Sequence, residues 1–519
     1  MVTPNEKLAA SLAQLRELQQ GGRRVFQSKE LSRINRERLL RGGFVREVMK
    51  GWLISSSPTA DPADTTPWFA SFWEFCARYC QERFDDRWHL SPEQSLLLHA
   101  EDTVIPPQVT IYTPAGKNNT IQLLFGSSLY DLKQSLMPPS TDLLARDGLR
   151  LYDPEAALIR VSESFFAQKP LEAQIVLARI RDASGLLRRL LDGGHSAIAG
   201  RLAGAFRAVG RPELADEILR AMKAASYDVR EVDPFETRQT LARIERGAAP
   251  IVTRIQAMWN SLRDPVLKDF PFEPGLPKNK KGYLRFVDEM YQSDAYHSLS
   301  IEGYSVTPEL IDRVRSGNWN PDHHADDRQS RDALAARGYW QAFQLVKAAV
   351  SDAISGANAG SVVRTAHQDW YRELFQPCVS AGLIAPSALA GYRNHAVFIR
   401  GSRHVPPRWE AVRDAMPAFF DLLAEEREPA VRAVLGHWLF GYIHPYPDGN
   451  GRIARLLMNT MLASGGYPWT VIRVEDRTKY MSALEAASVD LDIEPFTKFL
   501  GERVKWSIDQ SGEKASERA

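Results

Sequence analysis

The feature that most constrains this chain is the twelve-residue string at positions 444–455, which reads HPYPDGNGRIAR. Its two prolines and two glycines exclude the middle of a helix, because proline removes a backbone donor and glycine favours turns. From Asn450 onward, apolar residues recur at spacings of three and four, which is typical of one helix face. The string therefore predicts a helix, a sharp loop, and a second helix with Asn450 as its N-cap.

The same string gathers residue types that handle phosphate groups. A helix N-terminus offers unpaired backbone N–H groups and the positive end of the helix dipole, which both attract anions. Arg452 and Arg455 are three residues apart, so they share a helix face and can both bind phosphate oxygens. Asp448 is placed to hold an oxygen-seeking Mg²⁺ ion, and His444 is suited to accept a proton from a hydroxyl group. A surface loop followed by a solvated basic helix is the alternative interpretation.

The string resembles the signature of the Fic family, HPFx(D/E)GNGRxxR, and departs from it only at Tyr446, where phenylalanine is usual. Fic proteins mostly transfer AMP from ATP to a hydroxyl group of a target protein. The resemblance implies that His444 is the base, that Asp448 is the Mg²⁺ ligand and that Arg455 holds the γ-phosphate. It assigns the remaining contacts with ATP to a phosphate cradle of four residues, Gly449, Asn450, Gly451 and Arg452.

Residues 298–303 read SLSIEG, which is similar to the inhibitory motif of the same family. The sequence predicts a helix over 284–302 that stops at Gly303, a residue suited to a left-handed end. Glu302 then lies in the last turn, where its negative charge opposes the helix dipole. The resemblance implies that Glu302 pairs with Arg455 and occupies the space of the γ-phosphate, while Ser298 packs against the site. An ordinary solvated glutamate is the alternative.

Residues 391–407 predict a β-hairpin, with strands at Val397–Ile399 and His404–Val405 and a turn at Gly401–Ser402. The segment resembles the Fic flap, which binds an extended target segment as an additional strand. A hairpin without that function is the alternative. Tyr480 resembles the family residue that lies near the adenine, although an aromatic residue at helical spacing also fits a core.

The fold class that we predict is a mainly α Fic domain, a helical bundle with a β-hairpin flap, preceded by an α+β winged-helix-like region. The resemblance covers roughly residues 233–508, where helical periodicity dominates. We expect a winged-helix-like domain at 1–95, an α+β domain at 96–232 and a Fic domain at 233–519 that includes the inhibitory helix 284–303. In the N-terminal half we also expect strands within 97–124, helices over 171–225 and a linker at 227–234.

Residues 23–50 carry nine Lys and Arg against three Glu, in a chain whose net charge is +1. Helices over 29–40 and 44–50, followed by a strand over 52–55, would give a winged-helix outline. Four side chains are then expected to face DNA phosphates: Arg38, Arg41, Arg46 and Lys50. The stretch and the segment after it are similar to AbiEi-type antitoxins of bacterial phage-defence systems. A solvated basic face and a winged helix that contacts protein are the alternatives.

The composition is that of a soluble globular protein, with 44% hydrophobic and 25% charged residues. The near-zero net charge argues against a surface covered by nucleic acid. Cys76, Cys80 and Cys378 cannot form a disulfide framework, which favours a reducing cytoplasm. We expect Cys76 and Cys80 to be buried thiols rather than half of a metal site, and His323–His324 to lie in a solvated loop. No apolar run is long enough to cross a bilayer, so no membrane partner is expected.

These observations predict a Mg²⁺-dependent protein adenylyltransferase that moves AMP from ATP to a Ser, Thr or Tyr hydroxyl and is autoinhibited by Glu302. Its partners would be ATP and a target protein bound as an extended strand along 391–407, and a homodimer stays open. One alternative is a DNA-binding transcriptional regulator or antitoxin-like protein, contacting DNA through Arg23–Lys50, with an accessory Fic domain. Another is a Fic enzyme that removes AMP or transfers a different nucleotidyl or phosphoryl group.

Overall fold

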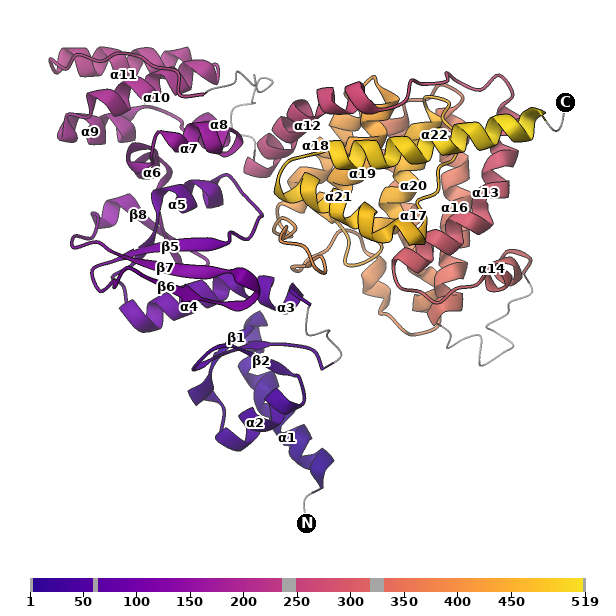
Figure 1. The fold of residues 1–519 in the computed structure, drawn as a ribbon, viewed down its shortest axis with the longest axis horizontal. Coiled ribbons are helices and arrows are strands. Elements are labelled where there is room, and N and C mark those ends of the chain that lie inside the picture. Colours follow the sequence, from indigo (N-terminus) through magenta and orange to yellow (C-terminus); the bar gives the residue numbers. More distant parts are fainter. Residues whose placement is uncertain (1–2, 59–63, 236–248, 318–330, 517–519) are drawn as a thin grey trace. The chain divides into compact units, whose positions relative to one another are not determined.

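The computed structural model describes residues 3–58, 64–235, 249–317 and 331–516 (Figure 1). By its contacts the chain divides into two compact units. Unit 1 comprises Met1–Pro250 together with Phe398–Val405, and unit 2 comprises Ile251–Val397 and Pro406–Ala519. The pair His323–His324, predicted to be a solvated loop, lies outside the described residues.

Unit 1 begins with a small helical and sheet region. Its elements are α1 (Pro4–Leu18), β1 (Val25–Gln27), α2 (Arg33–Arg41), β2 (Val45–Met49) and β3 (Trp52–Ser55). The strands pair antiparallel in the order β1-β3-β2, over a core that includes Leu15, Leu39 and Leu53. The strand predicted at 52–55 is confirmed.

One helix prediction in this region is wrong, and the start of another is displaced. The segment 44–50 contains strand β2 instead of a helix, because Val45 and Val48 are β-branched, become buried and gain backbone bonds to β3. The helix predicted over 29–40 begins only at Arg33, since the Ser32 hydroxyl accepts a hydrogen bond from the Asn35 N–H and caps the helix there.

The next part of unit 1 is a four-stranded sheet in the order β4-β5-β7-β6. Its strands are β4 (His89–Leu90), β5 (Gln108–Thr113), β6 (Asn119–Gln122) and β7 (Ser128–Lys133), and β8 (Leu143–Arg146) pairs separately with β9 (Leu149–Tyr152). Strands are thus confirmed within 97–124, although residues 97–99 close helix α5 (Pro92–His99). On α4 (Phe72–Phe84), Cys76 and Cys80 are buried as expected, and burial raises the pKa of both thiols.

Helices fill the rest of unit 1. They are α6 (Pro154–Arg160), α7 (Ser164–Gln168), α8 (Pro170–Arg179), α9 (Ser184–Gly193), α10 (Ser196–Ala208) and α11 (Pro212–Ala224). Those over 171–225 confirm the prediction, and α6 and α7 precede the predicted range. Figure 1 shows α10 and α11 side by side, and they share a core that includes Leu202, Phe206 and Ile218. After α11 the chain runs without regular structure over the predicted linker at 227–234.

Residues 398–405 belong to unit 1 because they pair with its backbone. The Ile105 N–H donates to the Arg403 carbonyl at 3.0 Å, and the Val405 N–H donates to the Thr103 carbonyl at 3.0 Å. His404 therefore forms an isolated antiparallel bridge with Val104. The two strands predicted within 391–407 do not pair with each other in this structure, because the second has a partner about 300 residues away in the sequence.

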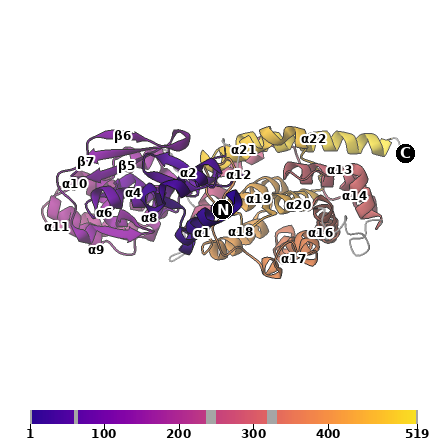
Figure 2. The ribbon, with the colours of Figure 1, turned by 90° about the horizontal axis from the view of Figure 1, so that it is seen from below.

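Within the described residues of unit 2, the regular elements are helices. Its elements are α12 (Pro250–Asp269), α13 (Lys280–Ile301), α14 (Pro308–Arg315), α16 (Arg331–Ala353), α17 (Ala359–Ser380), α18 (Val412–Glu425), α19 (Pro429–Ile443), α20 (Asn450–Ala463), α21 (Arg477–Val489) and α22 (Glu494–Ser516). This confirms the mainly α fold. Figure 2 shows the long α22 along one side of the unit.

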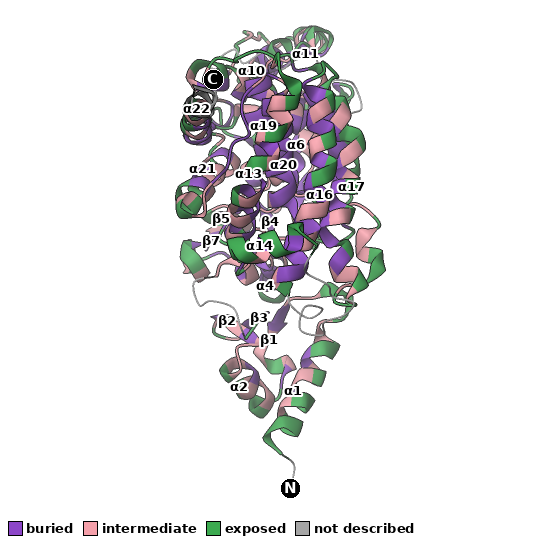
Figure 3. Cartoon of the chain, turned by 90° about the vertical axis from the view of Figure 1, so that its right-hand side faces the viewer, coloured by how far each residue is buried: buried purple, intermediate pink, exposed green. Residues whose placement is uncertain are grey.

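Helix α20 lies at the centre of unit 2. Every residue of α20 except Gly451 is buried, and Figure 3 shows this helix in the colour of buried residues. A helix that is buried on all sides must be surrounded by other elements, so its N-terminus is held rigidly by the bundle. Within the described ranges, none of the helices has the length and apolar character needed to cross a membrane.

Candidate active site

The string at 444–455 forms the predicted helix, loop and helix. Helix α19 ends at Ile443, and His444 takes a left-handed backbone conformation with φ 52° and ψ 59°, which turns the chain. Helix α20 begins at Asn450, but its N-cap is Gly449 with φ 79°, so the prediction of Asn450 as N-cap is wrong. The physical reason is that this cap position is left-handed, which glycine adopts without strain.

Asn450 instead closes the loop. Its Oδ1 atom accepts a hydrogen bond from the Tyr446 N–H at 2.9 Å, and its Nδ2 group donates to the Tyr446 carbonyl at 2.8 Å. The Tyr446 ring is fully buried and stacks on Tyr371, with ring centroids 3.9 Å apart. The Tyr446 ring therefore fills the core as expected. The loop between the two helices is held by the bonds of Asn450 to the Tyr446 backbone and by the packing of the Tyr446 ring.

His444 is arranged as a proton acceptor. Its Nδ1 atom lies 3.1 Å from the Gly441 carbonyl, which can only accept a hydrogen bond, so Nδ1 carries the hydrogen and Nε2 keeps its lone pair. The pKa of His444 is lowered to about 4, mainly by burial and in part by the charge of Arg393, while the hydrogen bond to Gly441 and the charges of Glu302 and Asp448 act in the opposite direction. The imidazole is therefore neutral at pH 7, which is the form that a general base requires.

Arg452 is a buried cation at the start of α20. Its side chain is 1% exposed and lies between the rings of Phe375 and Tyr304, at 4.9 and 5.3 Å from their centroids. The Asp448 carboxylate is 3.6 Å away, which is beyond hydrogen-bond distance. Within the described residues its Nε atom has no hydrogen-bond partner. Together with the first-turn N–H groups of α20, this guanidinium makes the helix N-terminus attractive to an anion.

Arg455, one turn further along α20, is bound by the end of α13. Its Nε atom donates to the Ser298 hydroxyl at 2.9 Å, and its Nη2 atom donates to the Ser298 carbonyl at 3.0 Å and to Glu302 Oε1 at 2.6 Å. Burial would lower the pKa of Arg455, but the Glu302 carboxylate raises it above its ordinary value. Burial acts to raise the pKa of Glu302, but the charges of Arg455 and Arg452 lower it. The predicted pair of Glu302 with Arg455 is present and fully charged.

The surroundings of Glu302 explain why a carboxylate is stable at the end of a helix. Glu302 is the C-cap of α13, and Gly303 follows in the left-handed conformation with φ 84°. A Cβ atom at Gly451 would overlap Glu302 Oε1, so the carboxylate lies directly against the first turn of α20. The positive N-terminal end of α20 and Arg455 therefore offset the unfavourable dipole of α13.

Other contacts hold α13 in place, and the sequence did not reveal them. The Arg477 Nε atom donates to the Ile301 carbonyl at 2.9 Å, and the Val474 N–H donates to His297 Nδ1 at 3.2 Å. Asp294 is buried and accepts a hydrogen bond from the Tyr339 hydroxyl at 2.6 Å, and burial raises its pKa to about 6. Asp294 stands four residues before Ser298, and that spacing is the signal that could have identified it.

Tyr480 and Asp448, predicted to lie near the adenine and to bind Mg²⁺, differ in their exposure to solvent. Tyr480 is buried, its hydroxyl lies 2.7 Å from His437 Nε2, and its ring packs near Phe496. In this conformation it is therefore a core residue. The Asp448 side chain is 64% exposed, and its Oδ1 atom accepts a hydrogen bond from the Gly449 N–H at 2.6 Å.

A single carboxylate at the edge of an anion site is nevertheless compatible with Mg²⁺. This ion binds proteins through one or two carboxylates and takes its other ligands from substrate phosphates and water. Among the described residues, no group of three or more His, Cys, Asp or Glu could hold a metal ion by itself. Any Mg²⁺ ion at Asp448 would thus depend on a phosphate ligand for the rest of its coordination.

In unit 1, much of the positive charge in the stretch 23–50 is already neutralised. Arg23 pairs with Glu30, Lys29 with Glu82 and Arg33 with Glu37. Of the side chains predicted to face phosphates, Arg38 donates to the Lys7 carbonyl and the Ser11 hydroxyl, and the Arg46 guanidinium lies over the Phe125 ring. Arg41 and Lys50 are exposed.

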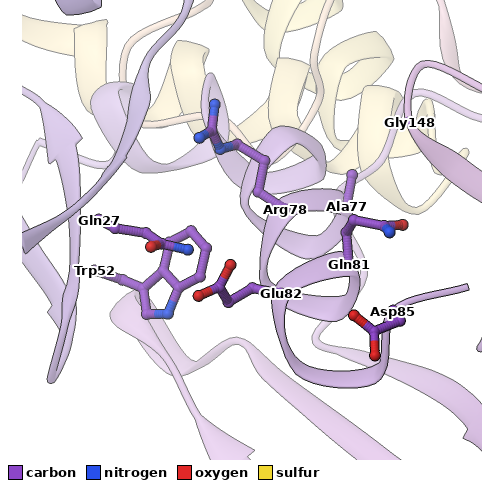
Figure 4. Close-up of a pocket in the computed structure, with 8 residues that line it drawn as sticks. All are labelled: Gln27, Trp52, Ala77, Arg78, Gln81, Glu82, Asp85 and Gly148. Carbon is purple, nitrogen blue, oxygen red and sulfur yellow. The ribbon is translucent and has the colours of Figure 1, made fainter. Parts of the chain in front are cut away.

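A cavity of about 560 Å³ also lies in unit 1, beside α4. Figure 4 shows Trp52 and Gln27 on one side of it and Arg78, Gln81 and Glu82 on the other. It contains none of the predicted phosphate-handling residues.

A proton acceptor at the end of α19, followed by a cationic N-terminus on α20, makes this loop the candidate phosphate-binding site of the helical unit 2. Residues 361–462, from α17 to α20, match the model of the Fic/DOC family, so the chain contains a Fic domain. The chain is similar to proteins named protein adenylyltransferase Fic. The protein from Nematostella vectensis is 28% identical over 281 residues, which are 53% of this chain and 60% of that protein. The protein from Drosophila willistoni is 36% identical over 132 residues, 25% of this chain and 26% of that protein.

This chain thus spans less than two thirds of the length of these relatives. Among solved structures, Fic-1 from C. elegans aligns with a TM-score of 0.39 and 18% identity, covering 67% of this chain and 99% of that one. A Fic domain containing signaling protein from Bacteroides thetaiotaomicron aligns with a TM-score of 0.34 and 20% identity, covering 50% of this chain and 94% of that one.

Proposed function

We propose that this chain is a protein adenylyltransferase that transfers AMP from ATP to a Ser, Thr or Tyr hydroxyl of a target protein. The observation that carries the proposal is the neutral His444, with an available Nε2 lone pair, six residues before Asn450, where α20 begins with its cationic N-terminus. The relatives named protein adenylyltransferase Fic support the same reaction.

In the proposed reaction, the target hydroxyl oxygen attacks the α-phosphorus of ATP. His444 Nε2 accepts the hydroxyl proton, the bond between the α-phosphorus and the bridging oxygen breaks, and pyrophosphate leaves with that electron pair. Arg452 and the first-turn N–H groups of α20 bind phosphate oxygens, and Arg455 binds the γ-phosphate once Glu302 withdraws. Mg²⁺, when bound, supplies further neutralisation of phosphate charge, and Asp448 is the residue that would hold it.

The pair of Glu302 with Arg455 supports autoinhibition. A carboxylate against Gly451 occupies the anion site with the same charge that a phosphate would bring. ATP would have to displace it before its terminal phosphate reaches Arg455. The resting chain is therefore proposed to bind ATP weakly or in an unproductive position.

The target is proposed to bind as an extended segment along residues 391–407. The bonds of 403–405 to Thr103 and Ile105 support this proposal, because that part of the segment is extended and already has an antiparallel partner from the same chain. A target segment would either use the residues before Phe398 or replace the pairing at 403–405. A cytoplasmic location is also proposed, supported by the free thiols of Cys76, Cys80 and Cys378.

The test is His444→Ala in the Glu302→Gly background. We expect the folded Glu302→Gly protein to transfer label from α-labelled ATP to itself and to a hydroxyl in a cell lysate, identified by mass spectrometry. The additional His444→Ala change should abolish the transfer without changing the melting temperature. A folded His444→Ala protein with undiminished transfer would contradict the assignment of the base.

DNA binding by the first part of unit 1 is a second proposal. It is supported by the sheet order β1-β3-β2 next to α2 and by the exposed cations Arg41 and Lys50. Because three of the cations in 23–50 are paired within the protein, we expect weak, salt-dependent binding. Fluorescence anisotropy with duplex DNA at several salt concentrations would measure it. Binding that is unchanged when Arg41 and Lys50 are both replaced by alanine would argue against this surface.

A further inference from the structure

Arg393 is a buried arginine in the segment between α17 and α18, and it bonds to the backbone next to His444. Arg393 is 1% exposed. Nε donates to the His444 carbonyl at 2.8 Å, and the Arg393 backbone N–H donates to the Pro445 carbonyl at 2.9 Å. Nη2 donates to the Ile443 carbonyl at 3.4 Å. One residue thus binds three consecutive carbonyls at the turn that follows α19.

Two guanidinium nitrogens of Arg393 also donate to carbonyls within its own segment, between α17 and α18. Nη1 donates to the His395 carbonyl at 3.2 Å, and Nη2 also donates to the Pro407 carbonyl. His395 and Pro407 both belong to the segment 391–407, along which we propose that the target binds. A single guanidinium therefore joins the backbone of the proposed base to two residues of the proposed target-binding segment, with all of these residues in unit 2.

Two physical arguments indicate that this arrangement matters for His444. The His444 backbone is left-handed, which is strained for a residue with a side chain, so surrounding bonds must hold it there. The last carbonyls of α19 also carry the negative end of the helix dipole and lack helical partners, and a cation is the favourable group to bind them. Burial lowers the pKa of Arg393 to about 10, so it is still charged at neutral pH.

We propose that Arg393 is a positioning residue for AMP transfer, which orients the His444 imidazole and fixes His395 and Pro407 of the target-binding segment relative to it. The proposal rests on the proposed function. Arg393 does not touch the reacting atoms in this scheme; it acts through the backbone of His444 and Pro407. Displacing a reacting group by about 1 Å can lower a rate by about a hundredfold.

The experiment compares Arg393→Met, Arg393→Lys and the control Arg413→Met, all in the Glu302→Gly background of the full chain. Arg413 lies exposed on α18 and donates to the Trp409 carbonyl in its own segment. Transfer of label from α-labelled ATP measures kcat, and titration calorimetry with Mg²⁺-ATP measures nucleotide binding. We expect Arg393→Met to lower kcat at least tenfold while the Kd for ATP changes less than about twofold. Arg393→Lys, which keeps one charged donor, should recover part of the rate, and Arg413→Met should match the parent.

The pH dependence of His444 separates positioning from a general loss of stability. Because the Arg393 charge contributes to lowering the pKa of His444, Arg393→Met should raise that pKa and Arg393→Lys should not. NMR titration of the His444 ring, assigned by comparison with His444→Ala, measures this without any catalysis. If the Glu302→Gly parent transfers no AMP, the proposed function fails and the NMR titration still decides the effect on His444. A folded Arg393→Met protein with the kcat and the His444 titration of the parent would overturn the proposal.

Discussion

Replacing Glu302 with glutamine removes the charge that faces Arg455 while keeping the size of the side chain. The Arg455 Nη2 and Glu302 Oε1 atoms are 2.6 Å apart, and the two side chains are 4% and 31% exposed. Removing one partner of a fully buried ion pair costs 3–5 kcal/mol, because the other charge stays buried alone. Here a third of the Glu302 side chain contacts water and Ser298 still binds Arg455, so we expect a loss of about 2 kcal/mol.

The same change should increase the rise in melting temperature that ATP causes. For a unit of this size, about 2 kcal/mol corresponds to a melting temperature lower by roughly 4–8 °C. ATP at about 100 times its Kd raises the free energy of unfolding by about 2.7 kcal/mol, because it binds only the folded protein. In the unmodified chain the gain is smaller at the same ATP concentration, since binding must first displace the Glu302 carboxylate. Glu302→Gln should therefore melt below the unmodified chain without ATP and approach it with ATP.

Calorimetric melting of the full chain with and without Mg²⁺-ATP measures both effects. The temperature compared between the proteins is that of the transition that ATP shifts. The matched control is Glu425→Gln, an exposed glutamate at the end of α18, which should melt like the unmodified chain under both conditions. The reasoning is refuted if Glu302→Gln melts at the same temperature as the unmodified chain and ATP shifts both proteins equally.

Four further outcomes follow from the same geometry. Gly451→Ala would place a methyl group on Glu302 Oε1, so it should lower the melting temperature of the unmodified chain but have much less effect in Glu302→Gly, as a double-mutant cycle by calorimetry would show. Asn450→Ala removes both bonds to the Tyr446 backbone and should reduce stability by about 2–3 kcal/mol, measured by denaturant unfolding. Because burial lowers the pKa of His444 to about 4, the rate of AMP transfer should be constant above about pH 6 and fall as the pH approaches 4. His444 also titrates near 6.5 when unfolded, so its contribution to stability should be lost as the pH falls from about 6.5 to 4, measured as melting temperature against pH.

Much of the candidate site was predictable because it depends on local backbone rules. Prolines and glycines between His444 and Arg452 permit only a tight loop, and the apolar spacing after it permits only a helix. The stop of α13 at Gly303 likewise follows from the left-handed preference of glycine. The pairing of Glu302 with Arg455 was predicted from the family resemblance, and the structure contains it.

Errors arose where side-chain preference and tertiary context disagree. Asn450 is a favourable N-cap by its residue type, but the loop geometry assigns that position to Gly449 and uses the amide to hold Tyr446. Similarly, residues 44–50 were predicted to form a second helix, whereas pairing with β3 made 45–49 a strand. Backbone pairing between strands is a tertiary interaction, and it overrides weak local propensity.

By itself, the sequence determined the loop at 444–455, the central apolar helix after it and the chemical character of its side chains. Only the tertiary structure decided which backbone groups these elements meet. Arg393 binds carbonyls at His444 and Pro407, and His404 pairs with Val104. Every residue carries a backbone carbonyl and almost every residue an N–H, so no pattern of side chains marks the ones that will be used. Such contacts are defined only when the packing of the core brings distant segments to the same place.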